Sequence, residues 1–453
     1  MPEIYKEELA KPLFSMYKDL SKWVEDEKNN IDLFLVNVAS FGSKPIVEKS
    51  GVNFINFMPV PPSPVHMDVE SDVTCRYPNI ISPPSLKDLK NSLSLRVKNQ
   101  VLCRLLDFYV FLISNYAVNE LYIEHAGINL LEERGLKSLK SYVNAGPQTM
   151  SLGGPPMNLK FKMDEKVHVL GILSKPKLGN LPEDMQKFLD QDNYEENENE
   201  NMKNSASFTR SDGVLYISMG TVFEFTDEDF MKLVEIIVSI PKKHNLRVLW
   251  SLKEAQQNKM KKFLPAETDF LKIEKFTPQP TVLKHKNVKI FLSHCGFGGV
   301  VDSVSAGVPI IAFPGGSDQN SNAQTLVDLE AAVILNKDFS NFHENLDFLL
   351  NQKNYEKYSK NTKNIGQTLK SYGGIAKAVE IMESAAEGKI TKPDQKLFNQ
   401  MNDIDPFFEI DQTFEKILAF GLMAFVVGIL PLTFCLIVKF CCCRSDKKKY
   451  KNE

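Results

Sequence analysis

The chain has 453 residues, of which 43% are hydrophobic, and its formal net charge is −3 at pH 7. This length and apolar content are sufficient for two or more domains with their own cores. Because the charges nearly balance, the composition gives no reason to expect a nucleic-acid partner.

The first half of the sequence alternates strand-like and helix-like segments. Residues 32–39 and 54–57 are short apolar runs typical of buried strands, and residues 42–49 between them favour a helix. A further strand-like run covers residues 167–173. This alternation predicts a parallel sheet covered by helices.

A polar, acidic run separates the two halves of the sequence. Residues 190–211 contain few apolar side chains, and residues 195–201 are all Glu or Asn. Such a segment cannot bury a core, so a solvated linker is the ordinary explanation. We therefore predict a first domain over residues 1–189, a flexible linker over residues 190–212 and a second domain over residues 213–410.

The second half begins with the same alternation. Residues 213–218 form a buried-strand pattern that runs into the turn Met219-Gly220-Thr221. A helical stretch over residues 227–239 and a strand over residues 247–252 follow. Ligands of such sheets bind at the carboxyl ends of the strands.

The most informative stretch runs from residue 276 to residue 319. Residues 288–293 are an apolar run that ends at a Gly-rich turn, and residues 300–306 have helical spacing. Free backbone N–H groups and the positive end of the helix dipole make a diphosphate the natural ligand of such a turn. The candidate site residues in this stretch are Phe276, Thr277, Gln279, His294, Gly296, Phe297, Gly298, Gly299, Asp302, Asp318 and Gln319.

The side chains in this stretch suit a nucleotide sugar. A carboxylate at Asp302 accepts hydrogen bonds from ribose hydroxyls, and the ring of Phe276 offers a face for a uracil. Asp318 and Gln319 follow a second strand over residues 309–313 and carry polar groups toward a sugar. Taken alone, Phe276 is more often a core aromatic and Asp302 a solvated helix residue. The joint spacing carries the prediction.

In these motifs the sequence resembles the UDP-glycosyltransferase family, which includes the glucuronosyltransferases. The turn after residues 213–218 also resembles the family, and the resemblance implies that Ser218, Gly220 and Thr221 lie close to the phosphates. It implies two Rossmann-like domains of the GT-B type, a UDP-sugar as co-substrate, and neither a metal nor another cofactor. It runs from about residue 10 to the C-terminus.

The sequence departs from the family at three points of the donor site. The family usually has Trp where this chain has Phe276, and Glu where it has Asp302, which is one methylene shorter. The turn holds Gly298 and Gly299, where Ser or Asn side chains are usual. Donor binding is therefore expected, while donor affinity and the choice of sugar stay open.

The catalytic base of the family has no counterpart in this sequence. In the family, a His that ends the first strand takes the acceptor proton, and an Asp on a later strand orients it. No His precedes His66, and Asn37 stands near the position of the Asp. Neither His66 nor His125 matches the family's base. A surface position is the more ordinary explanation for both.

The end of the sequence favours a membrane anchor. Residues 417–438 carry no charge and are long enough to cross about 30 Å of hydrocarbon. The basic residues of the tail 439–453 favour its placement in the cytosol. With the dilysine-like ending 449–453, this predicts a single-pass protein of the endoplasmic reticulum membrane with a lumenal donor domain. Cys75, Cys103 and Cys295 allow at most one disulfide outside this region.

The beginning of the sequence does not agree with that location. Residues 1–20 contain scattered charges and no apolar signal segment. Either the sequence is an N-terminally incomplete version of a longer protein, or the tail is inserted after synthesis and the domains remain in the cytosol.

Two functions remain open at this stage. The first is a UDP-glycosyltransferase that transfers a hexosyl or glucuronosyl group to a small lipophilic acceptor with inversion. The second is a catalytically inactive UDP-sugar-binding partner that associates with complete relatives, and the resemblance allows homo- or hetero-oligomers in both cases.

Overall fold

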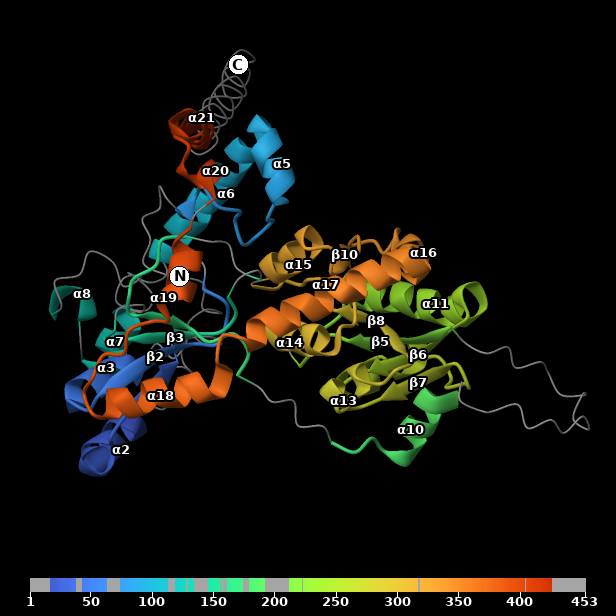
Figure 1. Cartoon of the computed structure of the whole chain (residues 1–453), viewed down its shortest axis with the longest axis horizontal. Coiled ribbons are helices and arrows are strands. Elements are labelled where there is room, and N and C mark those ends of the chain that lie inside the picture. Colours follow the sequence, from blue (N-terminus) through green and yellow to red (C-terminus); the bar gives the residue numbers. More distant parts are fainter. Residues whose placement is uncertain are drawn as a thin grey trace, which may run out of the picture. The chain divides into compact units, whose positions relative to one another are not determined.

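A computed structural model gives the structure of the chain. The residues that it describes are 17–37, 43–62, 74–112, 119–127, 129–133, 146–154, 157, 161–173, 179–191, 212–221, 223–316, 318–403 and 405–425. The chain divides into two compact units (Figure 1). Unit 1 comprises Met1–Lys18, Pro64–Ala145 and Ile404–Glu453, and unit 2 comprises Asp19–Ser63 and Gly146–Asp403.

The first sheet of unit 2 has four parallel strands in the order β1-β2-β3-β4. Its strands are β1 (Phe34–Asn37), β2 (Phe54–Met58), β3 (Thr149–Ser151) and β4 (Val167–Val169), and the helices near it in sequence are α2 (Tyr17–Glu27), followed by a short 3-10 turn (Lys28–Asn30), and α3 (Ser43–Ser50). Helix α18 (Gly374–Ala386), from the other end of the unit, packs Ala378 and Ile381 against Ile55 and Leu170. The core of this sheet therefore needs a helix that lies two hundred residues downstream in the sequence.

A buried histidine lies on β4 of this sheet. His168 is 3% exposed, and its Nε2 lies 3.1 Å from Oε1 of Gln148. The Gln148 Oε1 also accepts the backbone N–H of Thr391, so Nε2 of His168 is the donor in their contact. Burial, together with the positive charge of Lys377, lowers the pKa of His168 to about 4, although Glu380 acts in the opposite direction. The imidazole is therefore neutral in the folded protein at pH 7.

We expect His168 to make stability depend on pH between its unfolded and folded pKa values. The unfolded chain binds a proton below about pH 6.5, whereas the folded chain does not bind it until about pH 4. The free energy of unfolding should therefore fall by about 2 kcal/mol between pH 6.5 and pH 5 on account of this group. Urea unfolding of the wild type and of His168→Gln at pH 7.5 and pH 5.0 measures the effect. Equal losses of stability in both proteins would contradict it.

The second sheet of unit 2 has six parallel strands in the order β10-β9-β8-β5-β6-β7. Its strands are β5 (Gly213–Ser218), β6 (Leu246–Ser251), β7 (Leu271–Glu274), β8 (Val288–Ser293), β9 (Ile310–Ala312) and β10 (Ala332–Ile334). The helices of this part are α10 (Glu183–Asp190), α11 (Asp227–His244), α12 (Glu254–Lys259), α13 (Gln279–Leu283), α14 (Phe297–Ala306), α15 (Asp318–Asp328), α16 (Phe342–Leu350) and α17 (Gln352–Lys370), with a 3-10 turn at Lys261–Phe263. Figure 1 shows the strands of this sheet, from green for β5 to orange for β10, among these helices.

Alternate side chains of this sheet enter two separate cores. Tyr216 and Phe291 pack into one core with residues of α14 and α17. Ile217 and Leu292, their neighbours along β5 and β8, pack into the other core with residues of α11 and α16. Because successive side chains of a strand point to opposite faces, the sheet is covered by helices on both sides. This is the doubly wound arrangement that the sequence predicted for this half.

Helices α14 and α17 approach each other closely at a glycine. A Cβ atom on Gly366 of α17 would overlap the carbonyl of Val304 in α14. Near the same contact, Ser359 Oγ donates to the carbonyl of Gly307 over 2.7 Å, and Gly307 ends α14 with φ of +79°. Helix α17 therefore packs closely against the C-terminal half of α14.

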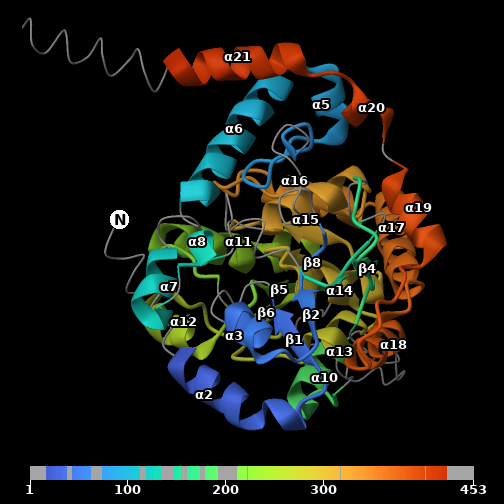
Figure 2. The same cartoon turned by 90° about the vertical axis from the view of Figure 1, so that its left-hand side faces the viewer.

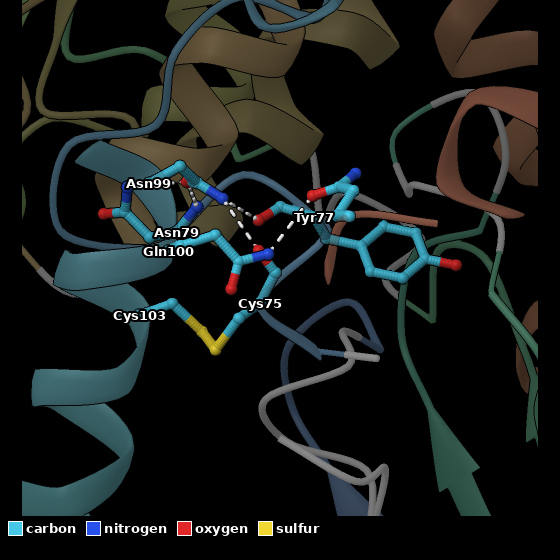
Figure 3. Close-up of a disulfide and its surroundings, with 7 residues drawn as sticks. Cys75, Tyr77, Asn79, Asn99, Gln100 and Cys103 are labelled. Atoms are coloured by element: carbon cyan, nitrogen blue, oxygen red, sulfur yellow. Dashed lines mark hydrogen bonds between the residues drawn. A yellow bond between two sulfur atoms is a disulfide. The ribbon is translucent and has the colours of Figure 1, made fainter. Parts of the chain in front are cut away.

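The described part of unit 1 is helical. Its elements are α5 (Leu86–Asn91), α6 (Leu93–Leu112), α7 (Asn119–Ala126), α8 (Leu130–Glu133), α20 (Pro406–Glu409) and α21 (Thr413–Ala424), and α19 (Gln395–Asn402) lies just before it in unit 2. A disulfide joins Cys75 to Cys103 of α6 (Figure 3). Cys295, in unit 2, is free and buried. Beside the disulfide, Asn99 Nδ2 donates to the carbonyl of Tyr77 over 2.7 Å and to that of Cys75 over 3.1 Å. The loop before α5 is thus held to α6 by covalent and polar contacts.

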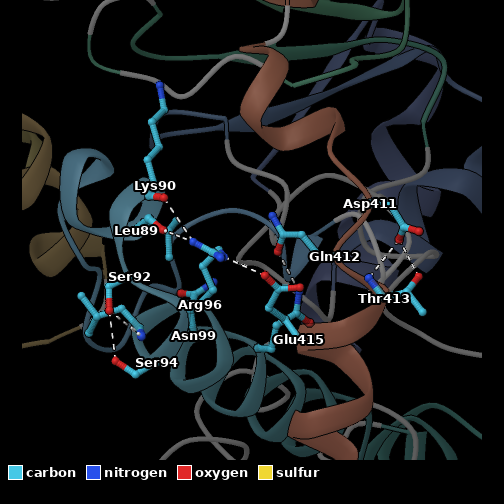
Figure 4. A network of polar contacts seen from close by, with 12 residues as sticks. Leu89, Lys90, Ser92, Ser94, Arg96, Asn99, Asp411, Gln412, Thr413 and Glu415 are labelled. Carbon is cyan, nitrogen blue, oxygen red and sulfur yellow. Dashed lines mark hydrogen bonds and ion pairs between the residues drawn. The ribbon is translucent and has the colours of Figure 1, made fainter.

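Helices α6 and α21 pack side by side in unit 1 (Figure 2). The Nε of Arg96 lies 2.7 Å from Oε1 of Glu415, and a further Arg96 nitrogen donates to the carbonyl of Lys90 over 3.1 Å (Figure 4). About one turn further along α6, Gln100 Nε2 donates to Gln412 Oε1 over 3.2 Å. The contacts of Arg96 with Glu415 and of Gln100 with Gln412 join segments that lie more than three hundred residues apart in the sequence.

The structure corrects the prediction of a transmembrane helix over residues 417–438. Helix α21 begins earlier, at Thr413, and is described as far as Ala424. Its first turn carries Glu415, which is buried against α6. Across the described residues, no helix combines the length and the apolar character that a bilayer crossing requires. Residues 426–453, which include the predicted basic tail, lie outside the described part.

Candidate functional site

Two turns meet at the carboxyl edge of the second sheet. Strands β5 and β8 are neighbours, and their last residues, Ser218 and Ser293, face each other in register. The turn after β5 contains Gly220 and Thr221, and the turn after β8 contains His294 to Gly296. The sheet topology therefore brings together two groups of predicted site residues that lie about seventy-five positions apart in the sequence.

The turn after β8 is fixed by its own backbone and by α15. Cys295 has φ of +62°, its N–H donates to Ser293 Oγ over 3.1 Å, and Asn322 Nδ2 donates to its carbonyl over 3.0 Å. Helix α14 then starts at Phe297, and the N–H of Val300 donates to the carbonyl of Gly296, the residue just before the helix, over 3.1 Å. The first N–H groups of a helix have no acceptor within it, and no side chain caps this end, so it suits an anion.

The imidazole of His294 lies between two glycines of this edge. A Cβ atom on Gly220 would come within 2.7 Å of His294 Cε1, and one on Gly296 within 2.5 Å of Nε2. Only glycines at both positions leave room for the ring. Burial lowers the pKa of His294, which the charge of Asp318 opposes, and Nδ1 is buried without a hydrogen-bond partner. A buried polar atom of this kind is expected where a ligand is bound.

Asp302 and Gln279 form a polar pair beside this turn. Gln279 Nε2 donates to Asp302 Oδ2 over 2.9 Å, which joins the start of α13 to the middle of α14. Burial raises the pKa of Asp302, and the hydrogen bond from Gln279 opposes that rise. The second carboxylate oxygen and the second amide hydrogen remain available for hydroxyl groups of a ligand.

Phe276 and Thr277 precede this pair and differ in their surroundings. The side chain of Phe276 is 80% exposed, whereas Thr277 is 4% exposed. A large exposed aromatic ring next to a polar site is the arrangement that base stacking requires. Phe276 is therefore not the core aromatic that the alternative interpretation offered.

Asp318 and Gln319 stand at the start of α15. Asp318 Oδ2 accepts from Asn322 Nδ2 over 2.9 Å, and Gln319 Oε1 accepts the backbone N–H of Gly315 over 2.8 Å. These hydrogen bonds stabilise the start of α15. The second carboxylate oxygen of Asp318 and the amide hydrogens of Gln319 remain for a ligand. Asn322, which orders both Asp318 and Cys295, was not predicted from the sequence. Its spacing of four residues from Asp318 on a helix is the signal that was available.

The residues considered for catalysis are not part of this group. Asn37 is the last residue of β1 and belongs to the four-stranded sheet. His125 lies on α7 in unit 1, and His66 lies outside the described residues. Among the described residues, no group of three His, Cys, Asp or Glu side chains is placed to hold a metal ion.

A cavity of about 500 Å³ in unit 2 lies away from these two turns. Its walls come from β4, the end of α17, α18 and α19, and none of the predicted donor residues lines it. The predicted donor residues therefore gather at the edge of the six-stranded sheet and not at this cavity.

Comparison with protein families agrees with this location. Residues 189–366 match the family described as UDP-glucoronosyl and UDP-glucosyl transferase. Anthocyanidin 3-O-glucosyltransferase 1 from Fragaria ananassa is 33% identical over 181 residues, which cover 38% of this chain and 36% of the relative. UDP-glycosyltransferase 84A3 from Arabidopsis thaliana is 33% identical over 119 residues, covering 26% of this chain and 24% of the relative. The chain thus matches about a quarter to a third of the length of these relatives.

Solved structures extend the similarity of the fold to both sheets. The calicheamicin glycosyltransferase CalG4 has a TM-score of 0.53 and 16% identity, and the match covers 83% of each chain. UGT2 of Phytolacca americana, solved with UDP-2fluoro-glucose and pterostilbene, has a TM-score of 0.52 and 15% identity, over 83% of this chain and 80% of that one. These matches support the predicted two-domain GT-B fold. Residues 189–366 are thus similar to the UDP-glucoronosyl and UDP-glucosyl transferase family, and the solved structures are similar to the chain in fold.

Proposed function

We propose that this chain binds a UDP-sugar and transfers its hexosyl group to a small lipophilic acceptor with inversion at the anomeric carbon. The donor residues that the sequence predicted gather at one edge of the six-stranded sheet. Relatives named as glucosyltransferases make UDP-glucose the first donor to consider, with UDP-glucuronic acid as the second.

The observation that carries this proposal is the Asp302–Gln279 pair beside the free N-terminus of α14. The helix end supplies N–H donors for a diphosphate. The Asp302 carboxylate, whose Oδ2 lies 2.9 Å from Gln279 Nε2, supplies acceptors for a ribose. Phosphate donors and ribose acceptors on one helix fit a nucleoside diphosphate. Charge that develops on the leaving UDP would be stabilised by the same N–H groups.

Transfer by the purified chain tests the proposal. The protein is incubated with UDP-glucose or UDP-glucuronic acid and a set of phenols and flavonoids, and UDP release and glycosylated products are measured together. We expect both to depend on the acceptor and to be lost in Gly296→Asp, which places a carboxylate against His294 and the phosphate turn. UDP binding without any product would overturn the transferase proposal but keep the donor site.

A second function, a UDP-sugar-binding partner without turnover, is favoured by one observation. Strand β1 ends at Asn37, near the position at which the family carries the Asp that orients the catalytic His. An Asn cannot stabilise an imidazolium by its charge. In that case UDP would protect the second sheet against unfolding while no glycoside is formed. The same experiment therefore separates the two functions.

We also propose that the chain folds in an oxidising compartment, such as the lumen of the endoplasmic reticulum. The Cys75–Cys103 disulfide supports this, because structural disulfides are rare where thiols are kept reduced. Trapping free thiols with a maleimide in intact cells, followed by non-reducing electrophoresis, tests it. Full labelling of Cys75 and Cys103 would contradict this location.

A further inference from the structure

We propose that Tyr216 is a positioning residue of the donor site, which orients Gln279 and, through it, the Asp302 carboxylate for recognition of the ribose. This inference rests on the proposed binding of a UDP-sugar. Tyr216 lies on β5 and is completely buried, so its own side chain does not reach the solvent-facing surface of the site. It was not among the residues that the sequence predicted.

The contacts of Tyr216 form one continuous chain of hydrogen bonds. Its hydroxyl lies 2.6 Å from Thr277 Oγ1 and donates to Gln279 Oε1 over 3.3 Å. Gln279 Nε2 in turn donates to Asp302 Oδ2 over 2.9 Å. The four side chains come from β5, the 276–278 segment, α13 and α14, so this series of hydrogen bonds connects these four parts of the structure.

The direction of every hydrogen bond in this chain follows from chemistry. A carboxylate only accepts, so the Gln279 amide must turn its NH₂ toward Asp302 and its oxygen toward Tyr216. The tyrosine must then donate to that oxygen, and the Thr277 hydroxyl must donate to the tyrosine oxygen. Burial raises the pKa of Tyr216 to about 12, so the phenol keeps the proton that this role requires at neutral pH.

Removal of the phenol oxygen would affect orientation more than packing. The Tyr216 ring stacks on Phe291 with centroids 5.1 Å apart, and a phenylalanine keeps that contact. The Gln279 oxygen, however, loses its donor, and the amide can rotate away from the position in which its NH₂ holds Asp302. The consequence should fall on hydroxyl groups that Asp302 and Gln279 bind and not on the uracil or the diphosphate.

The test compares UDP with 2′-deoxy-UDP by isothermal titration calorimetry. We expect the wild type to prefer UDP by about tenfold, which is the effect of one hydrogen bond to a charged group. In Tyr216→Phe this preference should fall to about threefold or less, while the affinity for 2′-deoxy-UDP stays within about twofold of the wild type. A role in folding alone would lower the melting temperature and leave the ratio of the two affinities unchanged.

Controls make each outcome decisive. Tyr355→Phe removes a phenol from α17 in the same unit, and it should leave the ratio at the wild-type value. If Tyr216→Phe does not fold, Thr277→Val removes the donor that aligns the tyrosine, and the ratio should fall in the same direction. A wild-type protein that does not bind UDP would overturn both the proposed function and this inference. A wild type that prefers UDP, with an unchanged ratio in both variants, would overturn the inference alone.

Discussion

Replacement of Asp302 by Asn is expected to weaken UDP binding by about tenfold to a hundredfold, the effect of losing one charge-assisted hydrogen bond that contributes about 1.5–3 kcal/mol. The carboxylate is held by Gln279 over 2.9 Å and has one oxygen free for the ribose. An Asn at this position keeps the size of the side chain but loses the charge, and its NH₂ group opposes that of Gln279. Calorimetric titration with UDP measures the change.

The matched control for this prediction is Asp269→Asn, which removes a carboxylate from an exposed position before β7. Its UDP affinity should equal that of the wild type. If Asp302→Asn binds UDP as tightly as the wild type, Asp302 does not contact the ribose, and the assignment of the uridine to this end of the sheet fails.

Removal of the disulfide is expected to have the largest effect on stability. Cys75 and Cys103 are 28 residues apart, and a loop of this length corresponds to about 3–4 kcal/mol in the chain-entropy account. The double variant Cys75→Ser and Cys103→Ser should therefore open unit 1 first, since only non-covalent contacts, such as those of Asn99 and the stacking of Tyr77 on Phe408, then hold the loop before α5. Limited proteolysis followed by mass spectrometry of the fragments measures this, with cleavage expected in residues 74–112.

The donor site provides the control for the disulfide variant. Its residues all belong to unit 2, so UDP affinity should change by less than about twofold, the range of substitutions away from a site. Reduction of the wild type with dithiothreitol should reproduce the proteolysis pattern of the double variant. Unchanged proteolysis in both would show that the loop is held without the covalent bond.

Local patterns predicted the donor half of the fold well because its strands are short and completely buried. Strands β5 and β8 have the predicted bounds, and β6 is displaced by one residue. The helix predicted over residues 227–239 continues to His244 and passes through Pro241. Ile240 fills the core, and Asn245, in the left-handed conformation, closes the helix four residues beyond the proline. Burial therefore outweighed the helix-breaking tendency of proline, which the sequence alone does not reveal.

Long-range contacts account for what the sequence did not predict. Helix α21 starts at Thr413, before the uncharged run from residue 417, and its Glu415 pairs with Arg96 on α6, a partner 319 residues away. Tyr216 has the pattern of an ordinary strand residue, and its role depends on Thr277 and Gln279, which lie about sixty positions later. Only a folded chain shows either pairing. The disulfide is intermediate, since the count of cysteines allowed one pair and the fold selected Cys75 and Cys103.

The close approach of α17 to α14 at Gly366 gives the donor turn a sensitivity to distant sequence change. Any side chain at position 366 would meet the Val304 carbonyl and force α14 or α17 to shift, and the anion-binding turn directly precedes α14. Inherited or engineered changes at this position would then lower donor affinity without touching the donor. Variation in this protein should accordingly be interpreted by the helix that a residue supports as well as by its distance from the ligand.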